Sequence, residues 1–411
     1  MSPSGAAMVV VGAGQAGARA ALTLGAEGHR GPVVLLGAES AAPYERPPLS
    51  KEFLKGERSL DSFTIATDEA LAAAGIDFRS GTTVTAIDRA RRRVTLDDAG
   101  TLPYDTLLLA TGRAPRRLPV PPTLEGAVHL LRDLSDAEAL KARLVPGARI
   151  AIIGGGFIGL EVAASARARG AEATVIELMP RLLARCVPAP LTARLERRHA
   201  AAGVEIILGR RIDRLAASAH GAAIQLDDGR RIEADAVLVG IGAAPRTALA
   251  EAAGLAVDRG VLVDELLCTS DPDIFAAGDV TACPHPLGGG LQRLESWHNA
   301  EEQGARAARN MLGAGERCMG LPWFWSDQYE LSLQMAGHPE RARRTIERDL
   351  GDQALLLFHL ADDGRLVGVS GIGPLSMVKE FKLARLLAER GLAPEPAALS
   401  DPAVQLKALL R

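Results

Sequence analysis

The sequence predicts an α/β fold in which one doubly wound architecture is used twice, followed by a C-terminal α+β domain. Two glycine-rich turns carry this prediction: Gly12-Ala13-Gly14-Gln15-Ala16-Gly17 follows the apolar run 8–11, and Gly154-Gly155-Gly156-Phe157-Ile158-Gly159 follows 150–153. One such turn is weak support, because glycine-rich turns also arise for steric reasons. Two copies, each between a β-branched strand and an Ala-rich helix, predict two Rossmann-like dinucleotide-binding domains.

The duplication continues beyond the glycine-rich turns. An apolar strand at 107–109 leads into Gly112-Arg113-Ala114-Pro115-Arg116, and another at 237–239 leads into Gly242-Ala243-Ala244-Pro245-Arg246. Within each half, alternating apolar and polar residues surround Asp- and Gly-containing turns at 97–100 and 227–229. Such runs are typical of antiparallel strands joined by tight turns. Each half is therefore expected to carry an antiparallel β-meander insert.

Prolines mark the expected connections between the domains. Pro119, Pro121 and Pro122 favour an extended linker, and a return linker is expected near Pro245. From Trp323 onward, strand-like segments, a hairpin turn at 362–365 and helical spacing at 375–390 indicate a separate domain. The expected domains are residues 1–118 with 247–322, residues 119–246, and residues 323–411.

The composition excludes several classes of function. A formal net charge of -3 over 411 residues argues against nucleic-acid binding, which needs a strongly basic face. The first seven residues lack Lys and Arg, which argues against a targeting signal, and no apolar run reaches the roughly 18 residues of a membrane span. A cytoplasmic location is therefore expected.

The four cysteines are scattered through the chain. They are Cys186, Cys268, Cys283 and Cys318, and no two of them form a C-x-x-C pair. This spacing disfavours a zinc site and a dithiol redox centre, so buried free thiols and no metal are expected.

Acidic residues after the second strand of each half indicate which dinucleotides bind. Glu177 ends the run 173–176, where a carboxylate accepts hydrogen bonds from the adenosine ribose and repels a 2′-phosphate. NADH is therefore expected, although Arg181 lies close enough in sequence to meet the 2′-phosphate of NADPH. In the first half, Gly37 and Ala38 follow the strand at 33–36, so the acidic residue comes about two positions later than in the second half. Glu39 is therefore the expected ribose ligand there.

The segment 269–280 helps to identify the first dinucleotide. Its apolar residues lead into Gly278-Asp279, where a carboxylate can accept from a ribitol hydroxyl and helix-end amides can face a pyrophosphate. Together with the two glycine turns and Ala110-Thr111-Gly112, this segment resembles the flavoprotein disulfide reductase superfamily over about residues 8–320. The resemblance implies FAD in the first site and NAD(P)H in the second.

One part of that superfamily pattern is missing. Members that reduce disulfides carry a cysteine pair shortly after the first strand pair, whereas this chain has Tyr44-Glu45-Arg46-Pro47-Pro48-Leu49-Ser50-Lys51 and no cysteine before Cys186. A disulfide relay is therefore excluded. This motif and Trp323-Phe324-Trp325-Ser326-Asp327-Gln328-Tyr329 resemble the NADH-dependent ferredoxin reductases that serve Rieske dioxygenases and bacterial cytochromes P450.

The resemblance also implies roles for individual residues. Lys51 would stabilise the reduced flavin, Glu161 would lie near the nicotinamide and pair with Lys51, and Trp325 would stack near the flavin or line the electron exit. A surface lysine, a helix-start acid and a core tryptophan are the alternatives. The expected FAD contacts are Gly12, Gly14, Ala16, Gly17, Glu39, Arg46, Lys51, Val84, Ala110, Thr111, Gly112, Arg132, Gly278, Asp279 and Trp297. The expected NAD contacts are Gly154, Gly156, Ile158, Gly159, Glu161, Glu177 and Gly242.

The function that follows is an FAD-dependent NADH:ferredoxin oxidoreductase. It would pass single electrons to a [2Fe-2S] ferredoxin that feeds a Rieske ring-hydroxylating dioxygenase. A cytochrome P450 as terminal enzyme, a quinone or other small acceptor, and a flavin-carrying signalling protein like apoptosis-inducing factor are the alternatives. Basic residues that could dock an acidic ferredoxin are Arg306, Arg309, Arg341, Arg343 and Arg344. The oligomeric state is left open.

Overall fold

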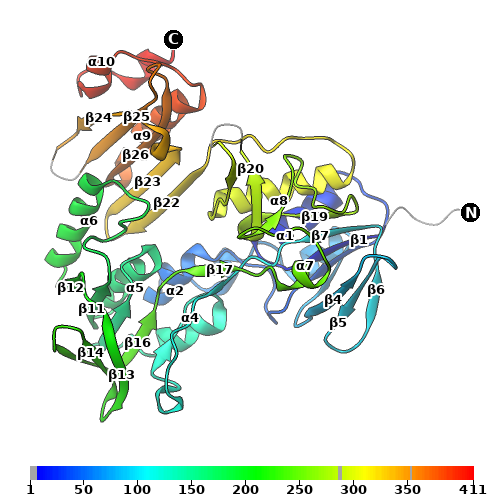
Figure 1. Cartoon of the computed structure of the whole chain (residues 1–411), viewed down its shortest axis with the longest axis horizontal. Helices are drawn as coiled ribbons and strands as arrows, with labels where there is room; N and C mark the ends of the chain where they lie inside the picture. The colour runs from blue at the N-terminus through cyan, green and yellow to red at the C-terminus, as the bar shows by residue number, and fades with distance from the viewer. Residues whose placement is uncertain (1–6, 286–288, 352–353) are drawn as a thin grey trace, which may run out of the picture. The chain divides into compact units, whose positions relative to one another are not determined.

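A computed structural model describes residues 7–285, 289–351 and 354–411. The expectation of no targeting signal rests mainly on residues 1–6, which lie outside the described residues. The chain forms two compact units (Figure 1). The first consists of Met1–Glu45, Leu60–Ala114 and Ala244–Pro322, and the second of Arg46–Ser59, Pro115–Ala243 and Trp323–Arg411. Among the described residues, no helix is long and apolar enough to cross a membrane.

These units group the chain differently from the three expected domains. Residues 46–59 belong to the second unit, together with the expected NAD-binding region and the C-terminal region. The division into three domains stays a prediction, and the two units are described in turn.

The first unit is built on a five-stranded parallel sheet in the order β19-β7-β1-β2-β3. Its strands are β1 (Met8–Val11), β2 (Val33–Leu36), β3 (Ile76–Arg79), β7 (Thr106–Leu109) and β19 (Ile274–Ala276). Every residue of β1 and β2 is buried, as expected for parallel strands that are covered on both faces. The predicted strands at 8–11 and 33–36 are confirmed.

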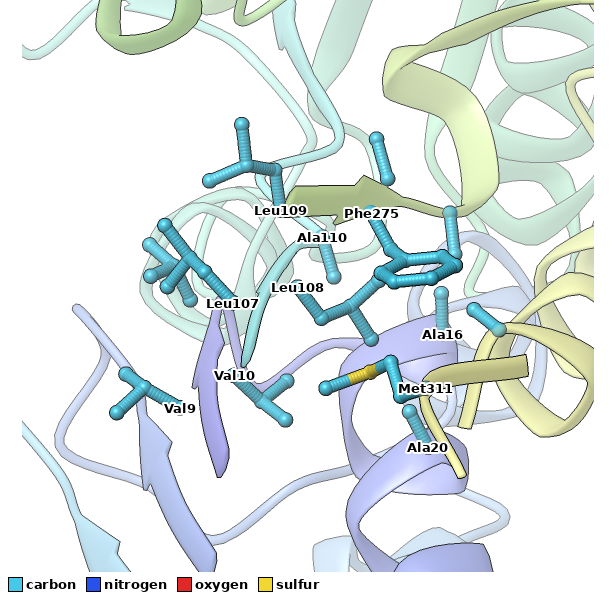
Figure 2. Close-up of a cluster of buried hydrophobic side chains, with 14 of the residues drawn as sticks. Val9, Val10, Ala16, Ala20, Leu107, Leu108, Leu109, Ala110, Phe275 and Met311 are labelled. Atoms are coloured by element: carbon cyan, nitrogen blue, oxygen red, sulfur yellow. The ribbon is translucent and has the colours of Figure 1, made fainter. Parts of the chain in front are cut away.

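Helices pack on this sheet through small side chains. Figure 2 shows Phe275 and Met311 against Val10, Ala16 and Ala20, with Leu108 of β7 beside them. The helices of this unit are α1 (Gln15–Ala26), α3 (Asp68–Ala73), α7 (Ala248–Ala252) and α8 (Trp297–Met311). α8 begins after Ser296, whose side chain accepts a hydrogen bond from Asn299 N and caps the helix.

Short strands complete the first unit. The predicted meander is confirmed as the antiparallel sheet β4-β5-β6, with the turn at 97–100 between its last two strands. A small sheet in the order β18-β20-β21 follows. The bounds of these strands are β4 (Val84–Asp88), β5 (Arg93–Leu96), β6 (Thr101–Pro103), β18 (Val261–Leu262), β20 (Thr281–Pro284) and β21 (Leu291–Gln292). Two further strands, β8 (Arg113–Pro115) and β17 (Ala243–Pro245), pair with each other.

The second unit repeats the architecture of the first. Its parallel sheet has the order β12-β11-β10-β16-β9, and the antiparallel sheet β13-β14-β15 stands where the first unit has β4-β5-β6. The bounds are β9 (Val128–His129), β10 (Arg149–Ile153), β11 (Glu172–Glu177), β12 (Val204–Leu208), β13 (Ile212–Ser218), β14 (Gly221–Leu226), β15 (Arg231–Ala234) and β16 (Ala236–Val239). The predicted duplication is therefore confirmed at the level of strand order.

The C-terminal region of the second unit is an antiparallel sheet covered by a helix. Its order is β22-β23-β26-β25-β24, and α9 packs against β26 and β23 (orange in Figure 1). The strands are β22 (Trp323–Gln328), β23 (Leu331–Gly337), β24 (Arg344–Asp349), β25 (Leu355–Leu360) and β26 (Leu366–Pro374). The helices of the unit are α2 (Glu52–Lys55), α4 (Leu134–Lys141), α5 (Phe157–Ala168), α6 (Ala189–Ala201), α9 (Val378–Glu389) and α10 (Pro396–Ser400).

This C-terminal sheet shares a hydrophobic core with the repeated architecture. Leu160 of α5 and Leu333 of β23 belong to one cluster of buried side chains, and Leu54 of α2 joins it. The predicted hairpin turn at 362–365 connects β25 to β26. The predicted helix at 375–390 begins as a 3-10 turn, Leu375–Met377, before α9.

Candidate functional site

The first glycine turn has the close backbone packing that its sequence requires. Gly12 has φ +107°, and a Cβ at this position would lie 2.3 Å from Ala110 O. A Cβ at Gly17 would lie 1.8 Å from Gly12 O, which no side chain can tolerate. Both positions therefore require glycine, because α1 starts directly against the strand that leads into it.

The second turn repeats this geometry in the second unit. Gly154 has φ +108° and a Cβ there would lie 2.4 Å from Gly240 O, while a Cβ at Gly159 would lie 2.2 Å from Gly154 O. The two turns are thus equivalent in backbone conformation and in the contacts that exclude a side chain.

The middle glycine of each turn faces open space instead. Among the described residues, no atom lies within 4 Å of a Cβ built on Gly14 or Gly156. Each is the N-cap of its helix, α1 or α5, and glycine has no side chain that could cap it. The amides at the helix start can donate hydrogen bonds to a pyrophosphate that lies in such a space. The residues of both turns therefore fit a dinucleotide.

Glu177 lies at the end of β11, beside the second turn. Its Oε2 accepts a hydrogen bond from Gly155 N at 2.7 Å, and its Oε1 accepts one from Met179 N at 2.8 Å. Arg181 is used locally, because its guanidinium donates to Val187 O at 2.8 Å, Thr192 Oγ1 at 3.0 Å and Ala184 O at 3.0 Å. The Glu177 carboxylate lies at the turn, where it would repel a 2′-phosphate, and the Arg181 guanidinium already donates to groups of its own loop. Both features favour NADH over NADPH.

Two more predicted NAD residues lie near these elements. Ile158, in the first turn of α5, exposes 42% of its surface, which is unusual for isoleucine. Gly242 has φ +97° and follows β16. Both lie on segments at the carboxyl ends of parallel strands, the edge at which open α/β sheets bind ligands.

In the first unit, the predicted Gly278-Asp279 pair lies against α1 and α8. Gly278 has φ +80°, and a Cβ there would lie 3.0 Å from the Cβ of Ala16. Gln303 of α8 holds this turn, because its Oε1 accepts from Gly278 N at 2.8 Å and from Thr281 Oγ1 at 3.1 Å. Asp279 is partly buried in the 3-10 turn Gly278–Val280.

Other predicted FAD residues of the first unit occupy several elements. Glu39 follows β2 and accepts a hydrogen bond from Tyr44 Oη. Thr111 donates through Oγ1 to Arg246 O at 3.0 Å. Val84 begins β4, Ala110 and Gly112 follow β7, and Trp297 begins α8. These segments all belong to one compact unit.

The remaining predicted FAD residues belong to the second unit. The Arg46 guanidinium donates to Arg132 O, and Arg132 N donates to Asp136 Oδ2 at 2.8 Å. Lys51 follows the 3-10 turn Pro47–Ser50. The predicted FAD contacts are thus divided between the two units of the chain.

Lys51 and Glu161 form a buried ion pair. Lys51 Nζ lies 2.9 Å from Glu161 Oε2, and the two side chains expose 12% and 4% of their surface. Lys51 Nζ also donates to Pro47 O at 3.2 Å. The predicted pairing is therefore present. The expected place of Glu161 in the first turn of its helix is wrong, because α5 begins at Phe157 and Glu161 lies in the second turn.

Two serines complete the surroundings of Glu161. Ser326 Oγ donates to Glu161 Oε1 at 2.6 Å, and Ser50 Oγ donates to Glu161 Oε2. Ser50 is held in turn, since its carbonyl accepts from Ser165 Oγ at 2.8 Å. A carboxylate that accepts two hydroxyl hydrogen bonds and an ammonium is satisfied in its ionised form, as a buried charge must be.

A chain of hydrogen bonds continues from Ser326 through β22 to α6. Gln328 Nε2 donates to Ser326 Oγ at 3.0 Å, and Gln328 Oε1 lies 2.7 Å from His199 Nε2. Because an amide oxygen only accepts, His199 carries its proton on Nε2, and its Nδ1 accepts from Tyr329 Oη at 3.2 Å. Burial lowers the pKa of His199 to about 4, which keeps it neutral.

Trp325 and Asp327 lie on the other side of β22. Trp325 stacks on Trp323 with ring centroids 5.0 Å apart and planes 20° from parallel. Burial raises the pKa of Asp327, although Ser332 donates to it. The role predicted for Trp325 stays a prediction.

Ser326, Gln328 and His199 were not predicted as site residues from the sequence. Ser326 and Gln328 are buried on one face of β22, whose three aromatic residues are followed by three polar ones, and this polar run within a strand was the available signal. No such signal marked His199, because its hydrogen bond to Gln328 depends on how α6 packs against β22.

The residues proposed for ferredoxin docking differ in their surroundings. Arg309 contacts Glu27 and Glu316, each at 3.2 Å, so its charge is already balanced. Arg306 is partly buried, whereas Arg341, Arg343 and Arg344 are exposed. Arg343 also has an acidic partner, Asp362 at 3.5 Å. The docking patch stays a prediction, and its better candidates are Arg341 and Arg344.

The cysteines were all expected to be buried. This is wrong for Cys186, which is exposed, and Cys268 is intermediate, whereas Cys283 and Cys318 are buried. Cys283 and Cys318 contact neighbouring residues of one segment, Asp264 and Glu265, which their separation in the sequence did not indicate.

Comparisons with known proteins agree with this arrangement. A family model described as pyridine nucleotide-disulphide oxidoreductase matches residues 6–304, and one described as reductase C-terminal matches residues 323–410. The chain is 43% identical over 405 residues to the anthranilate 1,2-dioxygenase system ferredoxin–NAD(+) reductase component of Burkholderia cepacia, covering 98% of each chain.

The chain is also similar to a putidaredoxin reductase, in sequence and in structure. The chain is 38% identical over 410 residues to putidaredoxin reductase of Pseudomonas putida, covering 98% of this chain and 96% of that protein. Among solved structures, the covalent putidaredoxin reductase–putidaredoxin complex matches with a TM-score of 0.94 and 37% identity, covering 99% of each chain.

Proposed function

The chain belongs to the pyridine nucleotide-disulphide oxidoreductase family, and we propose that it is the FAD-dependent reductase that oxidises NADH and reduces a [2Fe-2S] ferredoxin. FAD, when bound, accepts a hydride from NADH and returns the two electrons one at a time. The chain holds FAD through the Gly12–Gly17 turn and the Gly278-Asp279 turn, and NADH through the Gly154–Gly159 turn and Glu177.

The observation that carries this proposal is the buried pair of Lys51 and Glu161. Where disulfide-reducing members of the family carry a cysteine pair, this chain has a lysine that is 2.9 Å from a buried carboxylate. A fixed cation stabilises negative charge that develops on a neighbouring cofactor, and it cannot pass electrons itself. Electrons therefore leave to a separate protein and not through a thiol relay.

We propose that the cation of Lys51 favours the reduced form of the cofactor and that Glu161 holds Lys51 in place. Ser50 and Ser326 support this role, because they satisfy the carboxylate that Lys51 faces. Trp325 is proposed to lie beside the cofactors, and Arg46, Val84, Arg132 and Trp297 to contribute to FAD binding.

The ferredoxin is proposed to feed a Rieske ring-hydroxylating dioxygenase. In support, the relative at 43% identity belongs to an anthranilate dioxygenase system, and others belong to p-cumate and biphenyl dioxygenase systems. Rhodocoxin reductase and putidaredoxin reductase are also similar, so a ferredoxin of the P450 type is the second candidate. We propose that this protein acts in the cytoplasm, which fits the absence of a membrane-spanning helix among the described residues.

Turnover with a set of acceptors tests the proposal. The FAD-loaded protein is supplied with NADH and with a dioxygenase-type ferredoxin, a P450-type ferredoxin, menadione or dioxygen. We expect kcat/KM for the dioxygenase-type ferredoxin to exceed that for every other acceptor by at least about tenfold, or 1.4 kcal/mol. Ferricyanide reduction serves as the control for intact hydride uptake. Equal or faster reduction of menadione or dioxygen would contradict the proposal.

A further inference from the structure

Two cysteines that are distant in the sequence meet inside the first unit. Cys283 lies in β20, and Cys318 lies in the segment between α8 and the end of the unit. Cys283 Sγ lies 3.5 Å from Asp264 O and Cys318 N donates to Glu265 O at 2.7 Å, so both cysteines pack against the same short segment, and they expose 6% and 5% of their surface. They form a dithiol outside the residues that the proposed reaction uses.

Three donors converge on the sulfur of Cys318. Arg306 Nη1 lies 3.6 Å from this sulfur and Gln303 Nε2 lies 3.8 Å from it, in addition to the thiol of Cys283. A neutral thiol is a weak acceptor, whereas a thiolate is satisfied by several donors, one of them a guanidinium. The hydrogen bond from Cys283 and then the charge of Arg306 lower the pKa of Cys318.

Cys283 is placed to keep its proton. Its Sγ lies 3.5 Å from Asp264 O and 3.4 Å from Pro284 O, both acceptors of a thiol hydrogen. The hydrogen bond with Cys318 and burial raise the pKa of Cys283. The pair therefore combines a nucleophilic sulfur with a neighbouring thiol, which is the arrangement of an oxidisable pair with a resolving cysteine.

The segment that carries Cys318 is suited to local opening. Residues 312–322, all of them described, form neither helix nor strand. Arg317 and Met319, on either side of Cys318, are exposed, and Met319 exposes 51% of its surface. Hydrogen bonds from Asn310 to Glu316 and from Cys318 N to Glu265 O anchor the segment, but Cys318 is its one buried residue. A segment with so little buried surface opens at a smaller free-energy cost than the sheet.

Gln303 connects this dithiol to the Gly278-Asp279 turn. Its Nε2 donates to Cys318 Sγ, while its Oε1 accepts from Gly278 N at 2.8 Å and from Thr281 Oγ1 at 3.1 Å. Gln303 is itself 2% exposed, so its amide has few alternative partners. A change at the sulfur of Cys318 therefore acts on the side chain that holds Gly278.

We propose that Cys283 and Cys318 are a redox-sensitive dithiol that hydrogen peroxide converts into a disulfide, and that this conversion weakens the binding of FAD, an effect that rests on the FAD site proposed at Gly278-Asp279. The Cys318 thiolate attacks one peroxide oxygen, the O–O bond breaks, and after protonation the products are a Cys318 sulfenic acid and water. The Cys283 thiol then attacks this sulfur and expels a second water as the S–S bond forms. Two thiols lose two electrons and two protons in total, and peroxide accepts them. The disulfide sulfur no longer carries the charge that Gln303 and Arg306 face.

The pair can be tested in a C186S/C268S variant, which retains only these two cysteines and changes no residue placed in a cofactor site. The FAD-loaded variant is treated with peroxide, which is then removed with catalase, and thiols are counted after unfolding in guanidinium. We expect both thiols to be lost, to return with dithiothreitol, and to appear in one cross-linked peptide that joins Cys283 to Cys318. A C186S/C268S/C283S variant is the matched control and should yield no such cross-linked peptide, because its Cys318 sulfenic acid has no resolving thiol beside it.

The second readout is the release of FAD, followed by the fluorescence of the free cofactor. We expect the oxidised C186S/C268S variant to release FAD faster than the reduced one, and dithiothreitol to restore slow release. Two thiols still titratable after peroxide treatment, or irreversible oxidation without the cross-link, would overturn the dithiol. Equal release of FAD from the oxidised and reduced variant would overturn its coupling to Gly278.

Discussion

Lys51 Nζ lies 2.9 Å from Glu161 Oε2, and both side chains are almost completely removed from solvent. A buried carboxylate of this kind needs every partner it has, because an uncompensated charge in a protein interior costs several kcal/mol. Glu161 obtains its partners from two other segments of the chain, through Ser50 and Ser326. The cluster therefore depends on tertiary packing to bring the partners of Glu161 together.

Replacing Lys51 by Met should slow the reduction of FAD by NADH and lower its midpoint potential. A tenfold loss of preference for the reduced cofactor corresponds to about 30 mV for a two-electron couple. Stopped-flow absorbance and dye-equilibration titration measure the two quantities. Lys55→Met removes a lysine that pairs with Glu57 at the surface and should leave both unchanged. An unaltered potential in Lys51→Met would remove the proposed role of this lysine.

Ser326→Ala should slow the same reduction and also destabilise the protein. It deletes a hydrogen bond to a buried carboxylate, whose loss costs about 1–3 kcal/mol. Urea unfolding measures the stability and stopped-flow absorbance the rate. Ser370→Ala is the control, because Ser370 Oγ bonds a buried histidine, His359, in the same sheet at 2.8 Å. The control should lose comparable stability with no change in rate. Equal rate effects in both variants would indicate general loosening of the sheet.

Alanine at two neighbouring glycines should separate folding from cofactor binding. Gly156→Ala meets no described atom within 4 Å and has φ -83°, so the variant should fold but bind NADH more weakly. Gly159→Ala would place a Cβ 2.2 Å from Gly154 O and should lower the melting temperature. Calorimetry and NADH titration of both variants measure these outcomes. Normal NADH affinity in Gly156→Ala would contradict the site proposed at this turn.

Glu177→Ala should lower the preference for NADH over NADPH. The variant removes the carboxylate that repels a 2′-phosphate, and it also frees Gly155 N. We expect the ratio of kcat/KM for NADH to that for NADPH to fall by about tenfold, or 1.4 kcal/mol. Glu172→Ala, an exposed position at the other end of β11, is the control. A ratio that does not change would assign selectivity to other residues.

Stability should decrease as the pH falls from 6.5 towards 4, in part because of His199. Burial holds the pKa of this histidine at about 4 in the folded protein, below its usual value of 6.5. The unfolded chain binds the proton more readily in this range, so acid favours unfolding, and the contribution is fully present only above pH 6.5. It amounts to at most about 3 kcal/mol.

His199→Gln should therefore flatten the pH dependence of urea unfolding between pH 6.5 and 4. His220→Gln, at an exposed turn between β13 and β14, is the control and should retain the slope. Burial also lowers the pKa of His359 to about 4, so this histidine likewise makes the folded protein less stable as the pH falls. A slope that is identical in His199→Gln and the unmodified protein would mean that His199 is not protonated on unfolding.

Most of the fold was accessible from local patterns in the sequence. The apolar runs at 8–11, 33–36 and 150–153 became buried parallel strands because consecutive apolar residues can only be accommodated in a sheet covered on both faces. Both glycine turns could be located from spacing alone, since only glycine permits the approach of Gly12 to Ala110 and of Gly154 to Gly240. The same patterns identified the family and its cofactors.

The surroundings of the site were not accessible in this way. Ser326 contacts Glu161, Gln328 contacts His199, and Cys318 meets Cys283, although each pair is far apart in the chain. Sequence by itself determined the periodic elements and the glycine turns, because these depend on neighbouring residues and on backbone sterics. Only the tertiary structure decided which polar side chains share a buried environment, because that depends on how whole elements pack and on the need to satisfy each buried charge.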